Sequence, residues 1–198
     1  WITEGLLWCV FMGMDLLSIP GTAWPKFTAI AMCAAMACCT RNVYLAAALT
    51  FSALADVFLL LLNRSYALGV AIFLIVQMIH TLRLCRMRGV HPTAELVLRL
   101  IVGGIAAVCV MHIGMLSMLS AGYIAVFGLN VAEAVLFARS NRKSAAVRYA
   151  MGLALFFCCD LCVGITNLTG SGIAALGMWA FYLPGQVLIV SSAQGAYE

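Results

Sequence analysis

Long apolar segments fill most of this chain, and short polar or glycine- and proline-containing breaks separate them. The breaks include Pro20-Gly21, Arg41-Asn42, Arg83 to Pro92, Ser140 to Ser144 and Leu168 to Gly172. A helix that crosses a bilayer needs roughly 20 mostly apolar residues, and the segments between the breaks are about that long. The pattern therefore predicts helices at 3–19, 24–40, 43–63, 66–85, 94–113, 116–138, 145–167 and 173–193.

The composition agrees with lipid as the main solvent of this chain. Hydrophobic residues make up 65% of it and charged residues 9%, whereas about a quarter of a soluble domain is charged. We expect an all-α integral membrane protein in which residues 1–198 form a single transmembrane domain of about eight helices. The nine cysteines are interpreted as small apolar packing residues, so we expect no disulfide framework, metal site or cofactor.

Basic residues predict how the bundle is oriented. With eight helices, one face carries Arg41, Arg83, Arg86, Arg88, Arg99, Arg139, Arg142, Lys143 and Arg148, and the other carries Lys26 and Arg64. Short loops rich in Lys and Arg stay in the cytoplasm. We therefore expect both termini to be cytoplasmic, in a multi-pass protein of a bacterial inner membrane. The basic residues are too dispersed to indicate nucleic-acid binding.

Two aspartates, Asp56 and Asp160, stand deep inside predicted helices, and an asparagine follows each of them seven residues later, Asn63 and Asn167. A carboxylate at that depth loses hydration and gains nothing from lipid, so it needs a protein or water partner. Both helices run outward from the basic face, and both aspartates stand about 20 Å from it along the helix axis. We interpret them as two halves of one polar site.

The surroundings of the two aspartates resemble each other. Each segment has aromatic residues upstream, the aspartate, the asparagine, a short turn and then a helix with a glutamine, Gln77 or Gln186. The offset of 104 residues is about half the chain. Because four helices separate the copies, we predict a 4+4 parallel internal repeat with halves of roughly 1–90 and 91–198. An axis along the membrane normal would bring the aspartates face to face.

Two facing carboxylates in a medium of low dielectric cannot both ionise cheaply. One keeps its proton, so the pair offers one acid and one base. The candidates for orienting water or substrate are Asn63, Asn167, Gln77 and Gln186, and the candidates for further hydrogen bonds are Tyr66, Tyr182 and His80. A structural alternative is that the aspartates pair with an arginine or with backbone groups and lock the bundle.

Four stretches resemble the YhhN-type lysoplasmalogenase family of eight-helix membrane proteins, in which paired aspartates are the most specific feature. They are Pro25-Lys26-Phe27, FSALADVFLLL at 51–61 leading into YALGVAIFLIVQMIH at 66–80, MGLALFFCCDLCVGITN at 151–167 and WAFYLPGQVLIVSS at 179–192. The chain departs from the family pattern in two places. Gln77 stands where the family usually has a histidine, with His80 one turn later, and Pro25 precedes the lysine instead of following it.

The resemblance implies hydrolysis of the vinyl ether bond of a lysoplasmalogen, without a metal or cofactor, to a fatty aldehyde and a glycerophospho-head group. Asp56 and Asp160 would then be the catalytic acid and base, in an order that the sequence leaves open. A protonated carboxyl suits the first step, protonation of the β-carbon, and an ionised one suits the oxocarbenium ion that forms. On this view the partners are a lysophospholipid and membrane lipids, and Lys26 or Arg64 meets the phosphate.

The sequence is also compatible with two other classes of function. Parallel repeats with central carboxylates also suit a proton-coupled transporter of small molecules or lipids, with a cavity that opens to both faces. A structural or partner-binding subunit would lose only stability when the aspartates are neutralised. Composition and charge do not separate these classes, and the resemblance favours the enzyme. Neither they nor the resemblance indicates an oligomeric state.

Overall fold

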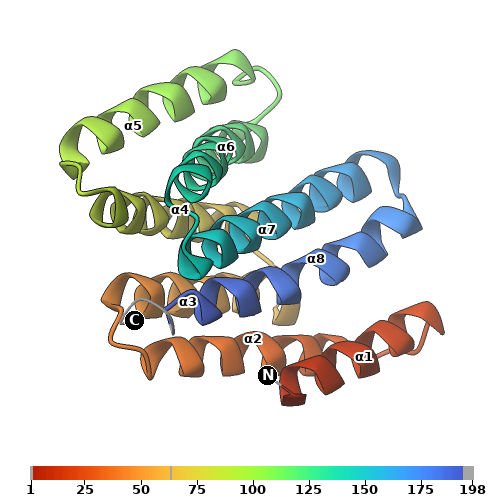
Figure 1. Ribbon diagram of the computed structural model, residues 1–198. Coiled ribbons are helices and arrows are strands. Elements are labelled where there is room, and N and C mark those ends of the chain that lie inside the picture. The colour runs from red at the N-terminus through yellow and green to blue at the C-terminus, as the bar shows by residue number, and fades with distance from the viewer. Residues whose placement is uncertain (1, 63, 194–198) are drawn as a thin grey trace.

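The computed structural model describes residues 2–62 and 64–193, and within them it contains helices and no strand (Figure 1). The helices are α1 (Ile2–Leu16), α2 (Ala23–Cys38), α3 (Val43–Asp56), α4 (Tyr66–Arg88), α5 (Pro92–Cys109), α6 (Met115–Asn141), α7 (Ser144–Thr169) and α8 (Gly172–Ser191), with a π-helical turn η1 (Val57–Leu61) that continues α3. The all-α class and the eight predicted helices are confirmed.

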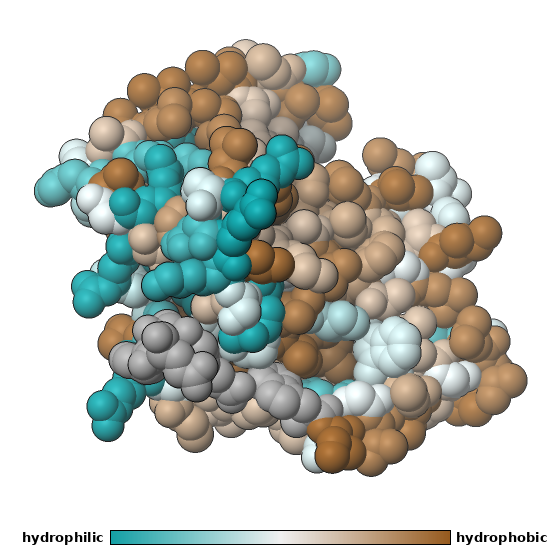
Figure 2. Space-filling view, in the orientation of Figure 1, coloured by the Kyte–Doolittle hydropathy of each residue, from teal (hydrophilic) through white to brown (hydrophobic). Residues whose placement is uncertain are grey.

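Most of these helices have the length and apolar composition of membrane-spanning segments. Six segments are long and apolar enough to cross one, Val43–Leu61 and the five helices from α4 to α8, and α2 is a shorter apolar helix. Apolar residues cover much of the visible surface in Figure 2. Hydrophilic residues gather on the left of that view, the side where the α2–α3 and α4–α5 loops lie in Figure 1. The α2–α3 and α4–α5 loops therefore lie at the hydrophilic end of the bundle.

An aromatic cluster joins four helices at the centre of the bundle. Phe156 of α7 lies 5.7 Å from Phe73 of α4, 5.0 Å from Phe127 of α6 and 5.3 Å from Tyr182 of α8, measured between ring centroids. Aromatic pairs at such distances add about 0.5–1.5 kcal/mol each to the free energy gained by burial. This cluster positions the helices that carry the predicted site, while α1 and α5 lie at opposite edges of the bundle in Figure 1.

The predicted 4+4 repeat is not confirmed by the local structure around the two aspartates. The helix that carries Asp56 passes into the π-helical turn η1 directly after it, whereas α7 continues through Asp160 as a regular α-helix to Thr169. The aspartates also receive hydrogen bonds from tyrosines at unrelated repeat positions, Tyr182 on α8 and Tyr123 on α6. The repeat therefore stays a prediction.

The backbones of α7 and α8 pack closely against each other at two glycines, Gly152 and Gly185. A Cβ atom on Gly152 would lie 2.7 Å from Ile189 Cγ1 and 2.8 Å from the backbone oxygen of Gly185. A Cβ on Gly185 would in turn lie 3.0 Å from the backbone oxygen of Gly152. The two helices can reach this separation only because both positions lack a side chain.

We expect Gly152→Ala to lower the free energy of unfolding by about 1–3 kcal/mol, because the two backbones must separate to admit the methyl group. Gly104→Ala on α5 is the matched control, since its added Cβ meets nothing within 4 Å. The control should be neutral or stabilising by up to about 1 kcal/mol, because alanine favours helices. Unfolding followed by circular dichroism in detergent measures both. Equal stability of the two variants would contradict the α7–α8 packing.

Candidate active site

Asp56 and Asp160 line the same cavity, which has a volume of about 440 Å³. Asp56 closes α3 and is buried, with 6% of its surface exposed, and Asp160 stands in the second half of α7 and is partly exposed. The cavity lies where α3 and α7 end and where α4, α6 and α8 begin. A volume of this size is typical of pockets that hold a small molecule.

The walls of the cavity are mostly apolar. They include Leu59, Leu60, Val70, Phe73, Leu116, Ile124, Phe156, Val163, Met178 and Trp179. The π-helical turn after Asp56 supplies Leu59 and Leu60, and it closes with a hydrogen bond from the Leu62 amide to the Val57 carbonyl at 2.9 Å. A π-helical turn inserts an extra residue into a helix and occurs often at functional sites. The site is thus a hydrophobic chamber with two acidic groups in its wall.

Each aspartate accepts a hydrogen bond from a buried tyrosine. The Tyr182 hydroxyl donates to Asp56 Oδ2 at 2.7 Å, and the Tyr123 hydroxyl donates to Asp160 Oδ2. The rings are held by the aromatic cluster, with Tyr182 5.5 Å from Trp179 and Tyr123 5.7 Å from Phe127. Sequence reasoning identified Tyr182 and missed Tyr123. The signal for Tyr123 was its place inside an apolar helix, because a buried tyrosine hydroxyl usually has a polar partner.

The described part of the cavity wall contains carboxylates but no cation. Its lining includes no lysine, arginine or histidine, and neither aspartate takes part in any ion pair within residues 2–62 and 64–193. The structural alternative in which an arginine neutralises the pair therefore has no support in these residues. Two carboxylates in an apolar wall without a cation favour sharing of protons, which is a suitable arrangement for acid and base catalysis.

The other predicted residues fall into two groups. Tyr66 and Asn167 line the cavity and are exposed, so they mark its open end. Gln77, Gln186 and His80 are buried and do not belong to the lining, and His80 Nδ1 instead lies 3.0 Å from the Tyr149 hydroxyl. Asn63 lies outside the described residues. The substrate-binding roles of all these side chains stay predictions.

Residues 21–193 match the YhhN family, which covers most of the chain. The chain belongs to the YhhN family. No curated protein and no solved structure matches it. The matched range includes both aspartates and both tyrosines that donate to them, whereas α1 lies before it. The family suggests a hydrolase, and the site described above is the cavity in which this YhhN chain brings two aspartates together.

Lys26, one of the residues on which the resemblance to the YhhN family rests, lies behind the cavity wall. Its ammonium group is 2.6 Å from Asp15 Oδ2 and 4.9 Å from the centroid of the Trp179 ring, and Trp179 lines the cavity. Lys26 is 7% exposed. The pair thus supports the wall through Trp179, and the proposed contact of Lys26 with a phosphate stays a prediction.

No metal site is evident in the described part of this YhhN chain. No group of three or more metal-binding side chains comes together within it. Cys159 and Cys162 have the spacing of a Cys-x-x-Cys motif, but both are free thiols. Cys159 lines the cavity, while the sulfur of Cys162 packs against Gly177 of α8. Their different directions fit the interpretation of these cysteines as packing residues.

We expect Lys26→Met to lower the free energy of unfolding by up to about 3 kcal/mol, because it leaves the half-buried Asp15 without its cation. Adding Asp15→Asn to this variant should recover part of that loss. A double-mutant cycle measured by thermal unfolding in detergent gives the coupling between the two residues. Additive effects of the two substitutions would show that the ion pair contributes nothing to the free energy of unfolding.

Proposed function

We propose that this YhhN protein hydrolyses the vinyl ether bond of lysoplasmalogens. The observation that carries the proposal is the cavity in which Asp56 and Asp160, each bonded to a tyrosine, share apolar walls without a cation. An apolar chamber suits the alkenyl chain of a lysolipid, and two carboxyl groups supply the acid and base that the bond requires. Membership of the YhhN family supports the same class of reaction.

The reaction needs one proton donor and one carboxylate. The protonated carboxyl delivers its proton to the β-carbon of the vinyl ether, and the electrons of the double bond form the new C–H bond. The resulting oxocarbenium ion is stabilised by the ionised carboxylate, which also removes a proton from the water that adds to it. The hemiacetal then collapses to an aldehyde, and a proton returns to the departing glycerol oxygen. The net change is the addition of one water molecule.

The open end of the cavity suits the polar part of a lysolipid. Tyr66 and Asn167 are exposed there and can hydrogen-bond to glycerol or phosphate oxygens. We infer that this end faces away from the cytoplasm, because the basic loops lie at the opposite ends of the same helices. Both termini are then cytoplasmic, and the source membrane is proposed to be a bacterial inner membrane.

A proton-coupled transporter is the alternative function for a pair of membrane carboxylates. Alternating access requires a site that opens to either face. The described cavity occupies only one end of the bundle, and buried Gln77 and Asn130 lie on its other side. This arrangement favours a chamber that a lipid enters and leaves from one side.

Purified protein in detergent should release fatty aldehyde from lysoplasmalogen without any ion gradient. Asp56→Asn and Asp160→Asn should each lower kcat/KM by about 10²–10⁴-fold, since each removes one acid–base group. Glu4→Gln is the matched control, because Glu4 is equally buried but lies on α1 away from the cavity, and it should keep full activity. A folded but inactive wild type that takes up protons with its substrate in vesicles would favour the carrier.

Hydrolysis in D₂O distinguishes vinyl ether protonation from cleavage of an ester. We expect one deuterium on the carbon next to the aldehyde group, because that carbon takes its new hydrogen from an exchangeable carboxyl proton. Immediate reduction of the product to the alcohol prevents later exchange, and mass spectrometry counts the label. A product without carbon-bound deuterium would exclude the proposed first step even if the enzyme cleaves the lipid.

A further inference from the structure

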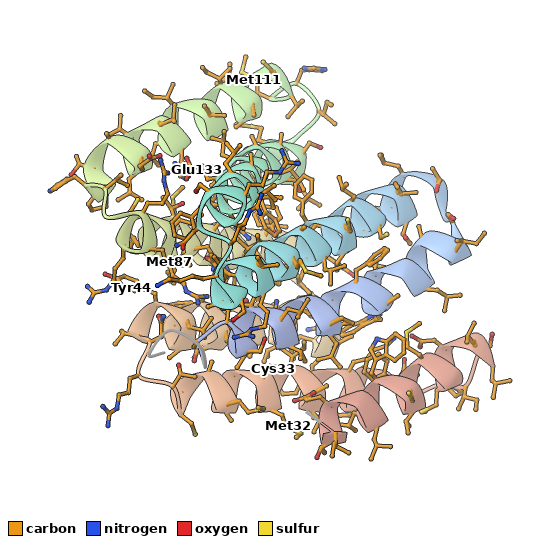
Figure 3. The ribbon with its side chains drawn as sticks, viewed as in Figure 1. Met32, Cys33, Tyr44, Met87, Met111 and Glu133 are labelled. Carbon is orange, nitrogen blue, oxygen red and sulfur yellow. The ribbon has the colours of Figure 1, made fainter. Side chains whose placement is uncertain are left out.

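Four charged residues form a compact cluster at the end of the bundle opposite the open end of the cavity. Arg99 of α5 is fully buried and lies 2.7 Å from Glu95 and 2.5 Å from Glu133 of α6. Arg88 of α4 lies 3.2 Å from Glu95 and 3.0 Å from Glu133. Figure 3 labels Glu133 at the side of α6 that faces α5. The cluster holds the Arg99 guanidinium in one position, and from there a chain of buried amides leads back toward Asp160.

The first amide in this chain has only one possible orientation. Arg99 Nε donates to Asn130 Oδ1 at 3.0 Å, and a guanidinium has donors but no acceptor. The oxygen of the Asn130 amide must therefore face Arg99, and its nitrogen must face away. That nitrogen donates to the side-chain oxygen of Gln77 at 3.2 Å and to the backbone oxygen of Gln77 at 2.8 Å.

The same argument determines the orientation of the next two groups. Because Gln77 Oε1 accepts from Asn130, its other amide atom, Nε2, is the one left for other partners. This Nε2 is buried and makes no hydrogen bond of ordinary geometry within the described residues, but the Gln77 side chain interacts with the Tyr123 hydroxyl. An amide nitrogen can only donate, so in this interaction Gln77 is the donor and the phenol oxygen is the acceptor. The Tyr123 proton is then left to point at Asp160 Oδ2, where its hydrogen bond lies.

The surroundings of Asp56 impose no such direction. Its partner, the Tyr182 hydroxyl, receives no hydrogen bond from any residue in the part of the chain that the structure describes. A hydroxyl can donate or accept, and it rotates to suit its neighbours. Tyr182 can therefore accept a proton from a neutral Asp56 as readily as it donates to an ionised one, whereas Tyr123 is restricted to donating.

We propose that the Arg99–Asn130–Gln77–Tyr123 chain divides the roles of the two aspartates. It keeps Asp160 as the ionised carboxylate that stabilises the cation and activates water, and it leaves Asp56 as the acid that protonates the β-carbon. Asn130 and Gln77 are positioning residues, because they act on Asp160 through Tyr123. The roles rest on the proposed function, but the location of the proton does not require any reaction to occur.

Infrared spectroscopy of the full chain in detergent at neutral pH tests where the proton lies. We expect a C=O stretch from a protonated carboxyl that Asp56→Asn removes and Asp160→Asn keeps. A band that loses no intensity in Asp56→Asn relative to the wild type, or that loses intensity in Asp160→Asn, would overturn the assignment. Both outcomes are independent of aldehyde release, so an inactive protein with the expected spectrum would refute the hydrolase and leave the proton assignment in place.

An isosteric change, Asn130→Asp, tests whether the amide chain causes the division. The new carboxylate still faces Arg99 but cannot donate, so Gln77 turns its nitrogen toward residue 130 and its oxygen toward Tyr123. Tyr123 then donates to Gln77, and Asp160 takes up a proton. We expect an additional protonated-carboxyl band that Asp160→Asn removes in the same background, and a kcat about ten- to a hundredfold lower with little change in KM.

The matched control for this change is Thr81→Val. Thr81 Oγ1 also donates to Asn130 Oδ1, at 2.9 Å, but Arg99 alone is enough to orient the amide. The control should therefore keep the wild-type infrared spectrum. A wild-type spectrum in Asn130→Asp, or the same additional band in Thr81→Val, would show that the direction of the chain does not determine where the proton lies.

Discussion

The presence of two carboxyl groups in the wall of one apolar cavity is the constraint on which the rest of this structure depends. Such groups are costly unless they are hydrogen-bonded or neutralised, and no cation lies in the described wall. Tyr123 and Tyr182 supply the hydrogen bonds, so their rings must be held in place. That requirement explains the aromatic cluster around Phe156, and the cluster in turn requires α4, α6, α7 and α8 to meet at one point.

Other buried or half-buried charges are stabilised in a different way. Asp15 is neutralised by Lys26, Arg99 by Glu95 and Glu133, and Glu4 stands in the first turn of α1, where the free amide groups of a helix start favour negative charge. Each of these groups lies outside the cavity lining. Asp15 and Arg99 thus have partners of opposite charge, whereas the two carboxyl groups of the cavity have no cation in the described wall, an arrangement that suits proton transfer.

The sequence predicts well those features that follow from one helix at a time. The eight apolar segments and their bounds to within a few residues come from spacing along the chain. Features that depend on how helices rotate against one another are not predictable in this way. Tyr123 approaches Asp160 across 37 residues, and Gln77 lies behind that tyrosine instead of in the cavity. The π-helical turn after Asp56 has no glycine or proline to mark it.

Such a site must also determine which of its two carboxyl groups is the acid and which is the base. Two carboxyl groups in equal surroundings hold a shared proton without preference, yet acid–base catalysis needs the same one to be the donor in every cycle. The surroundings of the two aspartates are unequal. A π-helical turn follows Asp56, whereas an amide chain leads toward Asp160. A guanidinium that can only donate is a source of direction that amides alone cannot provide, because an isolated amide pair is stable in either orientation. Because that guanidinium lies among acidic residues and outside the cavity lining, it sets the direction without placing a positive charge in the cavity wall.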